Sequence, residues 1–202
     1  MSPAKVTLSP KELELVNNDD WILTKNAVIA KVYTLFGQLS ESYGAALSEQ
    51  LSSLSDTSRF LSPKIAKGEQ YEGLPWVMLD QPRCFGDADT FAIRSFFWWG
   101  RFCSITLQLE GKSKEKYAPL LQKYFASNPN NGWHIAIGDD KWKHDFGDNN
   151  YRLMQPGDHA LLNDLSFIKL SKKISLKNWD TLPDFFEQNF LELLKMLSSE
   201  KK

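Results

Sequence analysis

The spacing of apolar and polar residues predicts a long amphipathic helix in the N-terminal quarter of the chain. Apolar side chains recur three and four positions apart over residues 28–54, which gives one broad apolar stripe along a helix. We expect this helix to begin near Asp20 or Thr24 and to end in the serine-rich run from Ser52 to Ser58.

A shorter helix is predicted just before it. Ser9 precedes Pro10, and Glu12 follows Ser9 by three positions, which is the spacing of a capping box with proline in the first turn. The helix is expected to end at Asn17-Asn18.

The strongest strand patterns lie at residues 91–99 and 102–110. Gly100-Arg101 between them suits a two-residue hairpin turn in which glycine takes the positive φ. Other strands are expected at 75–79, 133–137 and 167–170, and other helices at 114–125, 160–165 and 183–197. Residues 56–74 and the turn Gln81-Pro82-Arg83 have the composition of irregular connections, and residues 138–157 that of an exposed loop or a hairpin.

These elements predict a single α+β domain over residues 1–202, with a helical part at about 10–55 and a mixed part at about 74–199. Its sheet should be mainly antiparallel around a central hairpin at about 91–110, packed by a long N-terminal helix and a C-terminal helix. A doubly wound nucleotide-binding fold is not expected, because strict strand–helix alternation and a glycine-rich phosphate loop are both missing.

Composition narrows the function classes. The 202 residues are 42% hydrophobic, and 24 Lys and Arg balance 25 Asp and Glu, so the chain lacks the basic excess of a nucleic-acid-binding protein. No apolar run reaches the length of a signal peptide or a membrane span, so a cytoplasmic location without a membrane partner is expected. Cys84 and Cys103 are then expected to be free, mostly buried thiols.

One arginine stands out in the predicted hairpin. With a two-residue turn, Arg94 faces Leu107 on a strand face that is otherwise apolar or nearly so. A core-facing guanidinium is costly unless its five donors are satisfied. Three interpretations stay open: an internal salt bridge or a guanidinium that reaches water, a site for an anion or carboxylate, and a change of register that turns Arg94 outward.

The other face of the hairpin is aromatic at its turn end, where Phe97, Trp99 and Phe102 lie. The C-terminal helix covers this face in one interpretation. In the other it is a partner surface, for instance that of a homodimer, because aromatic side chains are favoured in interfaces.

Catalytic and metal-binding patterns are weak. His134, His144 and His159 form no compact ligand pair, so no metal and no cofactor is expected, and the last two are interpreted as solvated loop residues. Asp80, at a strand end, is the best-placed acid. Its candidate partners are Arg83 and Arg94.

The segments GLPWVMLD (Gly73–Asp80) and FAIRSFFWWGRFCSITL (Phe91–Leu107), with Arg83 between them, resemble uncharacterised cytosolic bacterial families. The resemblance covers mainly residues 70–110 and the closing helix. Those families have no assigned activity, so the resemblance implies no functional residue.

The leading hypothesis is a non-enzymatic domain that binds a small anion or carboxylate, or a protein partner. Its candidate binding residues are Tyr71, Trp76, Asp80, Arg83, Arg94 and Trp98. The alternative is a hydrolase-like enzyme for a small molecule, in which Asp80 or His134 supplies acid–base chemistry and Arg94 orients the substrate.

Overall fold

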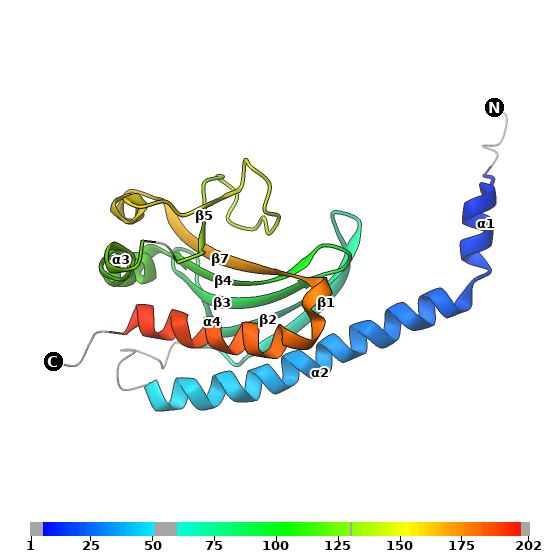
Figure 1. The fold of residues 1–202 in the computed structure, drawn as a ribbon, viewed down its shortest axis with the longest axis horizontal. Coiled ribbons are helices and arrows are strands. Elements are labelled where there is room, and N and C mark those ends of the chain that lie inside the picture. Colours follow the sequence, from blue (N-terminus) through cyan, green and yellow to red (C-terminus); the bar gives the residue numbers. More distant parts are fainter. Residues whose placement is uncertain (1–5, 51–59, 130, 199–202) are drawn as a thin grey trace.

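A seven-stranded antiparallel sheet forms the centre of the molecule, with long helices lying across one of its faces (Figure 1). The computed structural model describes residues 6–50, 60–129 and 131–198. The strands are β1 (Lys64–Tyr71), β2 (Leu74–Phe85), β3 (Thr90–Trp98), β4 (Phe102–Glu110), β5 (His134–Ala136), β6 (Tyr151–Leu153) and β7 (Phe167–Ser175), and their order in the sheet is β1-β2-β3-β4-β7-β5-β6. The predicted α+β class is confirmed, with its central hairpin and its N- and C-terminal helices.

The register of the central hairpin differs from the predicted one by one residue. Trp98 pairs with Phe102, and three residues rather than two connect the strands. Trp99 lies outside the pairing of β3 with β4; its N–H donates to the carbonyl of Pro75 on β2 (2.9 Å), and its ring meets that of Trp21. Gly100, with φ +68°, lies within the turn as expected. This shift changes which residues share a face of the sheet.

The face toward the helices is the apolar core. It is covered by α2 (Asp19–Gln50), α3 (Gly111–Ser127) and α4 (Leu182–Leu197). The hairpin contributes Phe91, Ile93, Phe97, Cys103, Ile105, Leu107 and Leu109 to it. Ser95 is the polar exception, and its hydroxyl lies 3.0 Å from that of Tyr43. Phe91 and Phe97 are therefore buried in the core beneath the helices.

Two predicted connections are strand instead. Residues 64–71 form the edge strand β1, whose sequence KIAKGEQY is too polar to be recognised as a strand. Gln81-Pro82-Arg83 belongs to β2, where a register shift and a cis Gln81–Pro82 bond accommodate the proline. The predicted helix at 160–165 is the 3-10 helix η2 (Asp158–Asn163), and a second 3-10 helix, η3 (Leu176–Thr181), follows β7. Of the two alternatives for residues 138–157, the hairpin is present, because the segment contains β6, which pairs antiparallel with β5. The strand expected at 167–170 continues to Ser175.

The N-terminal helices extend beyond the sheet. The capping box on Ser9 and Glu12 is present at the start of α1 (Pro10–Val16), and α2 begins at Asp19. The predicted end of the long helix around Ser52–Ser58 lies outside the described residues. Figure 1 shows α1 and the first turns of α2 projecting past the edge of the sheet. Among the described residues, no helix has the length and apolarity needed to cross a membrane.

Candidate functional site

Arg94 lies on the sheet face opposite the helices, and it is satisfied within the protein. The corrected register places it beside Thr106 rather than Leu107, so the apolar surroundings predicted for it are wrong. Asp80 is its direct neighbour on β2. Arg94 Nε donates to Asp80 Oδ1 at 2.7 Å, and Nη2 donates to Oδ2 at 3.0 Å. Of the three interpretations of Arg94, the internal salt bridge is the one present.

His144 completes the environment of the guanidinium. It lies in the β5–β6 loop (residues 137–150), and its Nε2 is 3.2 Å from Arg94 Nη1. Because arginine only donates, Nε2 must be the unprotonated acceptor. Burial, and then the charges of Arg94 and Lys169, hold the pKa of His144 well below its usual value. The expectation that His144 is a solvated loop residue is therefore wrong, because the loop folds back over the sheet and buries it.

A buried lysine lies near this group. Lys169 on β7 is 1% exposed, and its Nζ donates to the carbonyl of Lys143 in the β5–β6 loop. The same ammonium lies 5.4 Å from the centre of the Tyr151 ring. Burial, with a further contribution from Arg94, lowers the pKa of Lys169 to about 7. Two contacts therefore hold the β5–β6 loop on the sheet: the bond from Lys169 to the Lys143 carbonyl, and the bond between Arg94 and the neutral imidazole of His144.

An aromatic groove of about 420 Å³ lies between β1, β2, β3 and the β5–β6 loop. Its lining residues are Gly68, Glu69, Gln70, Tyr71, Trp76, Met78, Phe96, Trp142 and His144. Four aromatic side chains and one imidazole therefore surround one opening, which we call the aromatic groove.

Local sequence explains how the rings are placed. A Cβ on Gly68 would come within 2.6 Å of Trp76 Nε1, so the indole rests against bare β1 backbone. The ring of Phe96 on β3 lies close to two other rings of the groove. Its centre is 6.3 Å from that of Trp76 and 4.8 Å from that of His144. Tyr71 at the end of β1 is 5.8 Å from Phe96, ring centre to ring centre. Rings at these separations hold one another in defined orientations.

Hydrogen bonds fix the rim of the groove. The His144 N–H donates to the Tyr71 hydroxyl at 2.7 Å, which joins the loop to β1. Burial raises the pKa of this phenol, so it stays neutral at ordinary pH. Glu69 is the acidic group at the rim, and its carboxylate accepts from Lys25 Nζ of α2 at 2.7 Å. The groove is therefore mainly aromatic, with one paired carboxylate at its edge.

Three of the six predicted binding residues lie at or beside the groove. Tyr71 and Trp76 line it. Trp98 stands behind Tyr71, with ring centres 5.0 Å apart, and its Nε1 donates to the Tyr71 carbonyl at 3.2 Å.

The charged residues predicted for the site, and His134, lie outside the lining of the groove. Asp80 and Arg94 lie behind His144, bonded to each other. Arg83 is not among the lining residues, and its Nε donates to the Ser62 carbonyl at 2.6 Å. His134 on β5 also lies outside the groove lining, with its ring against Phe146 and a buried Nδ1. The structure therefore brings neither His134 nor Arg94 into the lining of the groove.

Sequence reasoning missed Phe96, Trp142 and His144 as groove residues. Phe96 lies two positions from Arg94 on one strand face, which is a usable signal once the face is known. Trp142 is a tryptophan in a polar loop, where an aromatic side chain often serves binding. No sequence feature showed that this loop returns to β1.

The cysteines and histidines form no further site in the part of the chain that is described. Cys84 and Cys103 are free thiols, and burial raises the pKa of Cys103. No group of three or more His, Cys, Asp or Glu that could hold a metal ion is found among the described residues. Comparison of the chain with protein families, curated proteins and solved structures found no match.

Proposed function

We propose that the aromatic groove binds a small molecule with a flat, apolar ring, and that the protein is a binding domain rather than an enzyme. The observation that supports this is the meeting of Tyr71, Trp76, Phe96 and Trp142 around one opening of about 420 Å³. Ligand pockets of this size are lined mainly by apolar and aromatic groups. Such rings favour a planar ligand, which they contact in offset-stacked or edge-to-face geometry.

The structure gives less support for a negative charge on the ligand than for a flat apolar ring. Asp80 occupies Arg94 Nε and Nη2, and His144 accepts from Nη1. An anion would have to displace a buried carboxylate to reach the guanidinium. The proposal therefore keeps the binding function expected from the sequence and assigns affinity to the rings rather than to Arg94.

The enzyme alternative has less support for a related reason. Asp80 is held by two bonds to Arg94, and the acceptor nitrogen of His144 faces the same guanidinium. A general base needs a free lone pair within reach of the proton that it removes. His134 is outside the groove lining, so neither predicted acid–base residue is positioned toward it.

Three ligands that share one ring and differ in charge test the proposal. We would titrate the protein with 2-naphthalenemethanol, 2-naphthoate and 2-naphthylmethylamine by calorimetry, and follow the indole N–H signals of the tryptophans by NMR. The neutral ligand should bind and shift the signals of Trp76 and Trp142. Substitution Trp76→Ala should weaken its affinity at least tenfold, because one wall of the groove is removed.

The matched control is Trp21→Ala, which removes an exposed indole outside the groove. It should leave ligand affinity unchanged. No binding of the neutral ligand would refute the proposed function. Binding of 2-naphthoate alone would restore an anion as the determining group and contradict the assignment of affinity to the rings.

A further inference from the structure

The N-terminal arm, residues 6–23, carries an unusually apolar exposed surface. Its large apolar side chains, each at least 44% exposed, are Val6, Leu8, Leu13, Leu15, Val16, Trp21, Ile22 and Leu23. All seven residues of α1 are described, and none is buried. Eight exposed large apolar side chains within this short segment are more than the singly scattered ones that a protein surface ordinarily carries.

Capping hydrogen bonds and a ring contact hold the arm in a defined conformation. At the start of α1, Ser9 N donates to Glu12 Oε2 at 2.7 Å, and Glu12 N donates to Ser9 Oγ at 3.3 Å. At the start of α2, Trp21 N donates to Asn18 Oδ1 at 3.1 Å. The Trp21 ring meets Trp99 of the hairpin turn edge-on at 6.2 Å, which anchors the base of the arm to the sheet. The sequence thus holds two helices on either side of a bend, although α1 buries nothing.

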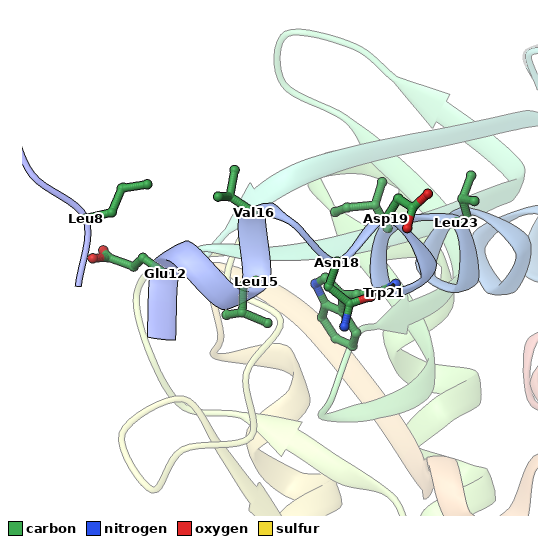
Figure 2. A pocket seen from close by; sticks show the side chains of 9 residues that line it. Leu8, Glu12, Leu15, Val16, Asn18, Asp19, Trp21 and Leu23 are labelled. Atoms are coloured by element: carbon green, nitrogen blue, oxygen red, sulfur yellow. Dashed lines mark hydrogen bonds between the residues drawn. The ribbon is translucent and has the colours of Figure 1, made fainter. Parts of the chain in front are cut away.

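The bend makes a hollow of about 740 Å³. Figure 2 shows Leu15 and Trp21 pointing to one side of the bend and Val16 and Leu23 to the other. The lining is completed by Leu8, Glu12, Asn18, Asp19 and Ile22. An apolar hollow formed by helices suits the apolar face of another helix, which is a common mode of peptide recognition.

The charge of the arm indicates what kind of partner fits. The arm, residues 6–23, contains four carboxylates, on Glu12, Glu14, Asp19 and Asp20, and one ammonium, on Lys11. Pairing the arm with the arm of a second copy would bring two such acidic surfaces together, and an anionic membrane would repel it. A basic partner instead gains attraction where its cations meet these carboxylates.

We propose that the arm is a docking site for a basic amphipathic helix of another protein. The apolar face of that helix lies against the hollow on the side of Leu15 and Trp21. Its Lys or Arg side chains are attracted by the carboxylates of the arm, to whose negative charge Glu14 and Asp20 contribute. This interaction is separate from the aromatic groove and does not depend on the ligand proposed for it.

A synthetic helix tests the proposal with the whole protein. The probe is a fluorescently labelled peptide of Leu and Lys with leucines at i, i+3, i+4 and i+7, and binding is measured by anisotropy. The same peptide with Glu in place of Lys should not bind. Raising the salt from about 0.15 M to about 0.5 M should weaken binding of the Lys peptide, because shorter screening lengths reduce charge attraction.

Two variants locate the site. Leu15→Gln with Val16→Gln keeps good helix formers and should reduce affinity at least tenfold. Glu14→Gln with Asp20→Asn should reduce it about tenfold, whereas Asp87→Asn with Asp148→Asn removes the same charge from exposed positions elsewhere and should leave it unchanged. Circular dichroism checks that each variant stays folded.

Three outcomes would overturn the proposal. Equal peptide affinity in the arm variant and the unmodified protein would place binding elsewhere. A dimer in light scattering that Leu15→Gln with Val16→Gln abolishes would assign the arm to a second copy. Sedimentation with vesicles of phosphatidylcholine and phosphatidylserine, lost in the same variant, would assign it to a lipid surface.

Discussion

Removing Arg94 alone should destabilise the protein strongly. The side chains of Arg94 and Asp80 are only 7% and 10% exposed, and two hydrogen bonds join them. Substitution Arg94→Leu leaves the Asp80 carboxylate buried without its cation, which costs about 3–5 kcal/mol. Total stabilities of domains are only about 5–15 kcal/mol, so the variant should unfold at a much lower urea concentration.

Removing both partners should cost far less than removing one. In Arg94→Leu with Asp80→Leu no buried charge of the pair is left uncompensated, and apolar replacement of a buried pair is often neutral or stabilising. Urea unfolding followed by tryptophan fluorescence gives the free energy of unfolding of the unmodified protein, both single variants and the double variant.

The double-mutant cycle gives a clear refutation. The expected coupling energy is at least about 2 kcal/mol, because each single variant carries a penalty that the double variant lacks. A single variant within about 0.5 kcal/mol of the unmodified protein, or a double variant destabilised by the sum of the singles, would contradict a buried structural pair.

Three further predictions concern the pH dependence of stability, a glycine with positive φ and the cap of α1. Because the folded-state pKa of His144 and of Lys169 lies below the unfolded values of about 6.5 and 10.4, the unfolded state binds more protons, and the free energy of unfolding should rise with pH. Urea titrations at fixed pH values measure this. Lys169→Met should flatten the rise of the free energy of unfolding above about pH 7, and His144→Gln should flatten it below about pH 6.5. An unchanged slope in either variant would contradict the argument that burial lowers these pKa values. Gly111→Ala should lower stability by about 2 kcal/mol or more, measured by thermal unfolding, since a Cβ there meets the Ala88 carbonyl oxygen and φ is +59°. Ser9→Ala should speed amide hydrogen exchange in α1 by the equivalent of about 1 kcal/mol and leave global unfolding unchanged, because α1 buries nothing; slowed or unchanged exchange would contradict the capping role.

Local chemistry was enough to predict the helices and the strand core. The capping box at Ser9 is present as predicted, and the apolar stripe along α2 packs on the sheet. These features depend on neighbours a few residues apart, which the sequence displays directly. β1 was missed because an edge strand with a half-exposed face has little apolar alternation to detect.

The candidate site was harder to predict because it depends on register and on a returning loop. A turn longer by one residue moved Arg94 from the partner Leu107 to the partner Thr106. Of the candidate residues, Tyr71 and Trp76 line the groove, whereas Asp80 and Arg94 are bonded to each other behind His144. Contacts of the β5–β6 loop with β1 join residues far apart in sequence, and no local pattern encodes them.

The strand order has a consequence for synthesis of the chain on the ribosome. β2, β3 and β4 form a meander of near neighbours, but β4 must wait for β7, where Leu170 pairs with Leu107, and β5 attaches to the sheet through β7. Until then the backbone edge of β4 is an open template for pairing with another chain. The loop that carries His144 is seated only after β7 docks, so a nascent chain lacking β7 has no assembled groove. Slow translation before residue 175 would therefore prolong an aggregation-prone state in which the groove is not yet assembled.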